Sequence, residues 1–192
     1  MQIVWFKRDL RIHDNEAFKR ACDAGPIIPL YIFEEDLWKK SPLCKKHYKF
    51  LKESLDDLNN DLENLGQSLI IEKSSAIKVF KKYKEKYGLK TVWSHQETWN
   101  YWVKKRNDKL SEWFIENKIK WIEVVQNGVI RNLKSRDGWS RKWNITMNKK
   151  LVANVSKLFK TCDKRYEVPS YKKLGLKDEK YRCFLLGGRK EG

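Results

Sequence analysis

The sequence has no long apolar run and few cysteines, which narrows the classes of protein to which it can belong. Only 4 of its 192 residues are cysteine, and none forms a C-x-x-C pair: Cys22, Cys44, Cys162 and Cys183. Isolated cysteines argue against a disulfide framework or a zinc ribbon and favour reduced thiols. No stretch of about 18 apolar residues occurs, and the N-terminus lacks the basic-then-apolar pattern of a secretion signal. We therefore expect a soluble, cytoplasmic protein without a membrane span. We also expect it to be a monomer.

Signatures of common nucleotide and catalytic sites are also missing. Neither G-x-G-x-x-G nor G-x-x-x-x-G-K-[ST] follows the first apolar run, so a phosphate cradle is not expected there. The histidines His13, His47 and His95 are far apart and form no H-x-x-x-H pair, which argues against zinc. Ser94 lies in no G-x-S-x-G elbow, so a serine-hydrolase triad has little support.

What the sequence has in excess is positive charge, and most of it lies near the C-terminus. The formal net charge is +17. Residues 1–125 contain 24 Lys and Arg against 19 Asp and Glu, whereas residues 126–192 contain 18 against 6. A surface this basic indicates an anionic partner, either nucleic acid or an acidic domain. A lysine-rich surface that is merely solvated is the alternative interpretation.

Apolar runs alternate with amphipathic segments up to residue 130, which predicts an α/β fold. Buried strands are expected at residues 1–6, 27–33, 69–71, 91–93 and 121–125, with helices after residue 15, over 43–65, after residue 75 and over 101–117. Connections of this length require parallel strands, so we predict a doubly wound, Rossmann-like sheet of five strands in residues 1–130. Beyond that point the periodicity fades, and residues 131–192 are expected to form a basic extension with a short helix or two around residues 143–159.

Charged clusters follow three of the expected strands, at residues 7–14, 34–36 and 94–98. In an open parallel sheet the carboxyl ends of the strands are where ligands bind. Arg8, Asp9 and Arg11 in the first cluster suit bidentate ion pairs that fix the loop or dock another domain. A catalytic role for these three residues is the less favoured alternative.

Several of these segments resemble motifs of the DNA photolyase and cryptochrome family. The N-terminal stretch resembles the W-F-[KR]-x-D-L-R-x-x-D-N opening of that family, and the later segments match further motifs in order. The segments are W-F-K-R-D-L-R-I-H-D-N at residues 5–15, P-L-Y-I-F-E at 29–34, K-H-Y-K-F-L-K-E-S-L at 46–55, S-H-Q-E-T-W at 94–99, Q-N-G-V at 126–129 and R-D-G-W at 136–139.

The resemblance implies an N-terminal α/β domain that can hold a light-harvesting antenna, followed in the family by a helical domain that binds FAD and damaged DNA. Gly187-Gly188-Arg189 resembles the segment with which the family enters that helical domain. In its full-length context the protein is then expected to be a deoxyribodipyrimidine photolyase, a carbon–carbon lyase driven by blue light. The chain alone is not expected to hold FAD or to repair DNA. A cryptochrome-type light sensor and a stand-alone nucleotide-binding module are the alternatives.

The family's antenna is methenyltetrahydrofolate, a deazaflavin or a flavin, and such a ring needs an apolar slot with a few orienting polar groups. Glu97 is the favoured ligand because a carboxylate can accept ring N–H groups, although it could instead pair with Arg106. The candidate antenna-binding residues are Arg8, Phe33, Glu34, Asp36, Lys46, His95, Gln96 and Glu97. The residues expected to contact DNA or the helical domain, in cis or as a separate chain, are Arg8, Asp9, Arg11, Arg131, Arg136 and Arg141.

Overall fold

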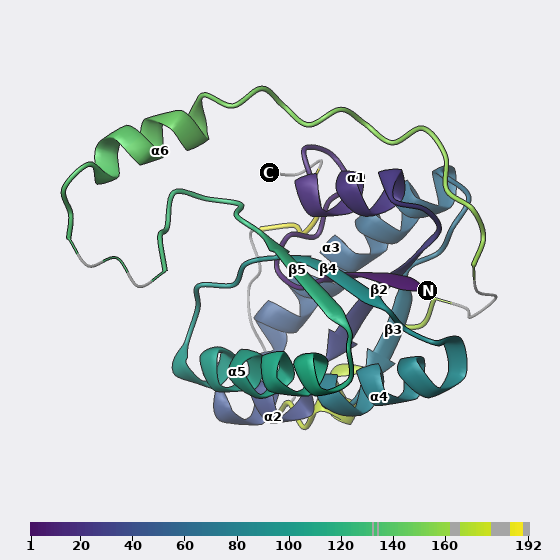
Figure 1. Ribbon diagram of the computed structural model, residues 1–192. Helices are drawn as coiled ribbons and strands as arrows, with labels where there is room; N and C mark the ends of the chain where they lie inside the picture. Colours follow the sequence, from purple (N-terminus) through teal and green to yellow (C-terminus); the bar gives the residue numbers. More distant parts are fainter. Residues whose placement is uncertain (132, 134, 162–165, 178–184, 190–192) are drawn as a thin grey trace.

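A computed structural model describes residues 1–131, 133, 135–161, 166–177 and 185–189. The part of the chain so described contains one sheet of five strands, all parallel, in the order β3-β2-β1-β4-β5 (Figure 1). The strands are β1 (Gln2–Phe6), β2 (Ile27–Phe33), β3 (Ile70–Lys73), β4 (Thr91–His95) and β5 (Lys120–Val124). The predicted doubly wound α/β fold is therefore confirmed, and the strand order reverses beside β1.

Helices cover both faces of this sheet. The strands are nearly continuous apolar runs because their side chains are buried on both sides. On one face α1 (Glu16–Asp23) and α3 (Lys45–Asn64) pack against alternate residues of the strands. On the other face α4 (Ala76–Tyr87) and α5 (Tyr101–Glu116) bury an aromatic cluster. Fully buried rings in that cluster include Trp5, Phe80 and Phe114.

The helix boundaries follow from capping residues that the sequence already contains. The side chain of Asn15 accepts a hydrogen bond from the Phe18 amide at 2.9 Å and so caps α1. Gly88 ends α4 with φ at +61°, a left-handed conformation that glycine adopts without a steric penalty. None of the helices in the described ranges combines the length and apolarity that a membrane crossing needs.

One helix was not predicted from the sequence. Residues 34–36 were expected to form an acidic loop after the second strand, but Glu35 and Asp36 occupy the first turn of a short helix, α2 (Glu35–Lys40). Acidic residues are stabilised there by the helix dipole, and lysines occupy its last turn. Trp38 anchors α2 because its ring is buried in the core beside Phe33.

The expectation of a helix or two around residues 143–159 was only partly correct. The helix, α6 (Trp139–Met147), begins earlier and ends earlier, and residues 150–161 are not helical. The backbone of this stretch bonds to the α/β body instead, since the Leu158 amide donates to Leu65 O at 2.7 Å. Leu158 and Leu174, which lies in the short 3-10 helix η1 (Tyr171–Leu174), are both buried in the core. In contrast, α6 contains no buried residue and extends away from the sheet (Figure 1).

Residues 185–189 return to α3 and lie along it. The Gly187 amide donates to Glu53 at 2.8 Å, and the Arg189 amide donates to Asp57 at 2.7 Å. These two carboxylates are one helical turn apart and therefore lie on the same side of α3. A Cβ atom at position 187 would lie 2.1 Å from Phe50 O, so only glycine allows this close approach.

Candidate functional site

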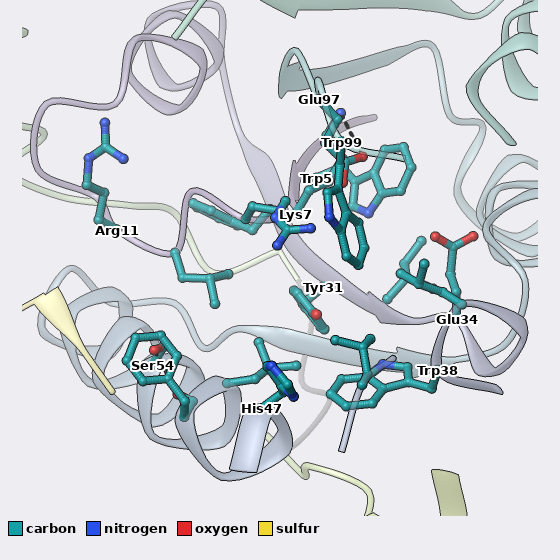
Figure 2. Close-up of a pocket in the computed structure, with 18 of the residues that line it drawn as sticks. Trp5, Lys7, Arg11, Tyr31, Glu34, Trp38, His47, Ser54, Glu97 and Trp99 are labelled. Carbon is teal, nitrogen blue, oxygen red and sulfur yellow. Dashed lines mark hydrogen bonds and ion pairs between the residues drawn. The ribbon is translucent and has the colours of Figure 1, made fainter. Parts of the chain in front are cut away.

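A cavity of about 740 Å³ opens at the carboxyl ends of β1 and β2 (Figure 2). Its walls come from the loop after β1, from α2 and the first half of α3, from the loop after β4 and from residues 185–189. The rings and aliphatic side chains that line it include Trp5, Leu10, Tyr31, Trp38, Leu43, Phe50, Leu51 and Trp99. The charged side chains that line it include Lys7, Arg8, Arg11, Glu34, Lys46, Glu97, Arg106 and Arg189. A mainly apolar cavity with a few charged groups has the character of a ligand pocket.

The structure brings four of the eight candidate antenna-binding residues together around this cavity. These are Arg8, Glu34, Lys46 and Glu97. They come from four different segments of the chain. Arg8, Glu34 and Glu97 follow β1, β2 and β4, which end at the same edge of the sheet, and Lys46 lies in the first turn of α3. Arg8 lies with its guanidinium 3.8 Å from the ring centroid of Trp99, so the loops after β1 and β4 touch across the cavity.

The other four candidates are not in the lining of the cavity. Phe33 is fully buried in the core, and Asp36 is an exposed residue of α2. His95 is buried against Asp9, and the Gln96 amide donates to Val124 O at 2.8 Å, which continues the pairing of β4 with β5. Among the described residues, no cluster of His, Cys, Asp and Glu could hold a metal ion.

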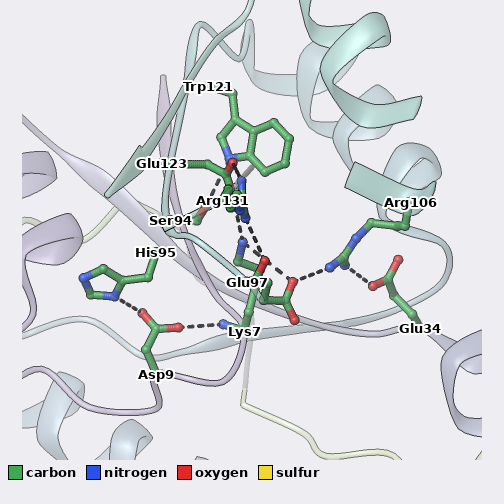
Figure 3. Close-up of polar contacts among 10 residues, drawn as sticks. All are labelled: Lys7, Asp9, Glu34, Ser94, His95, Glu97, Arg106, Trp121, Glu123 and Arg131. Carbon is green, nitrogen blue, oxygen red and sulfur yellow. Dashed lines mark hydrogen bonds and ion pairs between the residues drawn. The ribbon is translucent and has the colours of Figure 1, made fainter. Parts of the chain in front are cut away.

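Six charged side chains form a chain of alternating sign across the carboxyl edge of the sheet (Figure 3). We call it the charge chain: Arg131, Glu123, Lys7, Glu97, Arg106 and Glu34. Arg131 bonds Glu123 at 2.7 Å, Lys7 lies between Glu123 and Glu97, and Arg106 bonds both Glu97 and Glu34. The predicted alternative role of Glu97, pairing with Arg106, therefore describes a contact that the structure contains.

Burial shifts the pKa values of Glu34 and Lys7, two members of the charge chain. Burial raises the pKa of Glu34 above its ordinary value, although Arg106 and the Ala76 amide oppose this effect. Burial also lowers the pKa of Lys7, and the nearby carboxylates of Glu97 and Glu123 oppose it. Alternation of sign is what allows such groups to stay buried, because each charge has an opposite charge beside it.

Asp9 holds the loop after β1 in place through three hydrogen bonds. Its carboxylate accepts from the Lys7 amide at 3.2 Å, from Nδ2 of Asn15 at 3.4 Å and from Nδ1 of His95 at 2.6 Å. Burial opposes ionisation, but the hydrogen bond and charge of His95 and the bond from the Lys7 amide outweigh it, so the pKa of Asp9 lies below its ordinary value. Asp9 is therefore an anchor of the loop.

The arginines predicted to contact a partner lie in different places. Arg11 lines the cavity and donates to the carbonyl oxygens of His13 and Asp14, both at 3.1 Å. Arg131 belongs to the charge chain and also donates to Glu97 O at 2.8 Å. Arg136 and Arg141 are exposed near and on α6. The role of these residues in partner binding stays a prediction.

Sequence reasoning missed several residues of the cavity. Tyr31, Trp38 and Trp99 supply aromatic surface, yet none was among the candidates, because they were assigned to strands, core or motif matches. The pairing of Asp9 with His95 was also missed. A signal for it existed, since both residues follow or end strands that a doubly wound sheet places side by side.

The comparisons with known proteins agree with one another, since each finds photolyases or cryptochromes. The model of a family described as DNA photolyase matches residues 2–137. Cryptochrome-1 of Anopheles gambiae is 28% identical over 134 residues, which are 65% of this chain and 24% of that protein. Of the solved structures, the class III photolyase of Agrobacterium tumefaciens has a TM-score of 0.71 at 22% identity, covering 93% of this chain and 39% of that one. An archaeal photolyase of Sulfolobus tokodaii, described with two FAD molecules and a novel light-harvesting cofactor, has a TM-score of 0.64 at 20% identity, covering 84% of this chain and 39% of that one.

Proposed function

Since the chain belongs to the DNA photolyase family, as the match over residues 2–137 shows, we propose that its cavity binds a light-harvesting chromophore. The chain spans about a quarter of the curated relative and two fifths of the solved relatives described above. In the full-length context the proposed activity is blue-light-driven repair of pyrimidine dimers by a deoxyribodipyrimidine photolyase. The bound chromophore would supply the absorption of light, and the residues of this chain would bind it, orient it and exclude water.

The observation that carries this proposal is the size and lining of the cavity. A volume of about 740 Å³ falls within the range of small-molecule pockets and suits a planar ring system of two or three fused rings. The rings of Trp5, Tyr31, Trp38 and Trp99 offer flat apolar surfaces against which such a ring can stack. The charged groups at the carboxyl edge of the sheet can then fix its orientation.

The Sulfolobus tokodaii relative supports a second chromophore, because that photolyase is described with two FAD molecules. The FAD of the repair reaction is proposed to belong to a helical partner domain, and no residue of this chain is assigned to it. Arg131, Arg136 and Arg141 are proposed contacts of that domain or of DNA.

A cryptochrome-type light sensor is the second candidate, because Cryptochrome-1 of Anopheles gambiae is among the similar proteins. The two functions share this domain and differ in whether the full-length protein splits pyrimidine dimers under blue light. Dimer splitting measured on the full-length protein would support the photolyase, whereas light-dependent signalling without dimer splitting would support the sensor.

Blocking the cavity should weaken chromophore binding. Leu51 is a partly buried residue of α3 that lines the cavity, so the indole of Leu51→Trp would occupy space that a ligand needs. Equilibrium dialysis would use flavin mononucleotide, 8-hydroxy-5-deazaflavin and methenyltetrahydrofolate. For the ligand that the wild type binds most tightly, we expect the affinity to fall at least about fivefold, because overpacking of this size costs about 1–3 kcal/mol.

The matched control is Ile115→Trp, which adds the same ring to an exposed position of α5. It should leave the affinity unchanged. Binding by Leu51→Trp as tight as that of the wild type would contradict the assignment of the cavity. Failure of the wild type to bind any of the three chromophores would contradict the proposed function itself.

A further inference from the structure

Cys44 and His47 form a thiol–imidazole pair where α3 begins, at the rim of the cavity. Sγ of Cys44 lies 3.2 Å from Nδ1 of His47, within hydrogen-bond distance for sulfur. His47 lies in the wall of the cavity (Figure 2), and neither residue belongs to the charge chain. A nucleophile within reach of a base is the arrangement that covalent chemistry requires.

We propose that Cys44 is a site of reversible thiol–disulfide exchange, at which an anionic low-molecular-weight disulfide such as glutathione disulfide leaves a mixed disulfide on the sulfur. His47 is the base that takes the thiol proton. The exchange needs no chromophore in the cavity, so the inference goes beyond the proposed function and is tested independently of it.

The backbone determines the direction in which the proton is shared. Nδ1 of His47 accepts a hydrogen bond from the Cys44 amide at 3.1 Å, so this nitrogen carries a lone pair and the ring proton is on Nε2. The thiol must then donate toward Nδ1, because two acceptors do not form a hydrogen bond. The amide of Cys44 therefore orients His47 as a base for the sulfur of the same residue, as in other activated nucleophiles.

The sulfur is accessible and lies in a positively charged setting. Cys44 is half-buried, and His47 is exposed. Cys44 is the N-cap of α3, a helix of 20 residues with no acidic residue in its first turn, so the positive end of the helix dipole lies at the sulfur. Lys45 and Lys46 lie in that turn, and Lys46 also lines the cavity. Reactive cysteines occupy such partly exposed, electropositive positions, and the cations favour a disulfide that carries carboxylates.

The exchange is balanced by the pair and the incoming disulfide alone. Nδ1 of His47 takes the thiol proton as the Cys44 sulfur bonds to one sulfur of the disulfide. The S–S bond of the disulfide breaks, and its second sulfur leaves as a thiolate, which receives the proton from His47. One disulfide is consumed and one is formed, so no further oxidant is required.

Cys22 is an internal reference with the opposite surroundings. It lies in α1 and packs against the core. Burial, with a smaller contribution from the charge of Asp23, raises the pKa of its thiol to about 12. A thiol with so high a pKa is almost entirely protonated at neutral pH and is therefore a poor nucleophile. Cys22 should react much more slowly than Cys44.

Site-resolved kinetics on the wild-type chain test the inference. The chain is incubated with excess glutathione disulfide at neutral pH, and mass spectrometry of proteolytic peptides measures the mixed disulfide at each cysteine. We expect Cys44 to be modified at least about tenfold faster than Cys22, because exchange requires a deprotonated sulfur. Cystamine, a positively charged disulfide, should modify Cys44 more slowly than glutathione disulfide does, after each rate is divided by the rate with free cysteine.

The variant His47→Gln separates the base from the helix cap. Glutamine at the third position of a helix can accept a hydrogen bond from the N-cap amide, so the first turn of α3 should be retained, which circular dichroism checks. Glutamine cannot take the thiol proton, and we expect modification of Cys44 to slow at least about tenfold. The matched control His13→Gln changes an exposed histidine of the loop after β1 and should leave the rate unchanged.

Modification of Cys44 no faster than that of Cys22 would overturn the inference without any variant. A wild-type rate in His47→Gln would also overturn it, because the pair would then be a helix cap and no more. Faster modification by cystamine than by glutathione disulfide would rule out the anionic class of partner. Failure of the wild type to bind any chromophore would contradict the proposed function and leave these expected rates unchanged.

Discussion

Replacing Asp9 with alanine is expected to lower the free energy of unfolding by about 3–5 kcal/mol, the range measured when one partner of a buried charged pair is removed. The variant leaves His95, the Lys7 amide and Asn15 without their shared acceptor. Urea denaturation followed by tryptophan fluorescence measures the change. The matched control is Asp23→Ala, whose pair with Lys19 is at the surface and should contribute less than about 1 kcal/mol.

The Asp9 carboxylate should also contribute to the pH dependence of the unfolding free energy in acid. Because the pKa of Asp9 is lower in the folded state, its contribution is fully present above the ordinary aspartate value, about 3.9, and is lost as the pH falls through the lower folded value. The unfolding free energy of the wild type should therefore fall more steeply with acid below about pH 4 than that of Asp9→Ala. If the unfolding free energies of the two proteins fall equally with decreasing pH, the pKa of Asp9 is not lowered in the folded state.

Replacing Arg106 with methionine should be similarly destabilising at neutral pH, by about 3–5 kcal/mol, because it leaves Glu34 buried without its cation and Glu97 with Lys7 alone. Arg141→Met on the exposed α6 is the control and should change the unfolding free energy by less than about 0.5 kcal/mol.

The Arg106→Met variant should also regain stability in mild acid. Burial already raises the pKa of Glu34, and loss of Arg106 removes the main opposing effect, so the raised value moves further up. A carboxyl with a raised folded pKa contributes stability below its unfolded value, and this is lost as the pH rises through the folded value. Chemical denaturation at several pH values should therefore show the gap to the wild type narrowing from neutral pH to about pH 5. An unchanged gap would mean that Glu34 is not left unpaired in the variant.

The sheet could be predicted from the sequence because the buried strands are apolar runs, and because α1 and α4 begin or end at residues with a clear capping role. Asn15 and Gly88 mark boundaries through local chemistry that needs no tertiary information. The later part of the chain lacks such signals. Leu158 and Leu174 belong to the core, but their neighbours show no helical or alternating pattern, so only the folded body determines where they pack.

The candidate site could be predicted only in part, for a similar reason. Successive residues of a strand point to opposite sides, so Phe33 is buried in the core while Glu34, the next residue, lines the cavity. Candidates that are neighbours in the sequence therefore lie in two different environments. The charge chain needs the strand order and the position of α5, neither of which is visible in spacing alone. Lys7 lies inside the motif that names the family, yet its burial and its unpaired donors appear only in the folded structure.

The contact of residues 185–189 with α3 has a consequence for the order of folding. One wall of the cavity comes from residues 5–11 and another from residues 185–189, which are separated by nearly the whole chain. The sheet and its helices can form through much shorter loops, and contacts between distant segments form more slowly because loop closure costs more entropy. The sheet should therefore be complete before the cavity is closed, and a folding intermediate without the 185–189 contact would have its strands paired but its ligand site open.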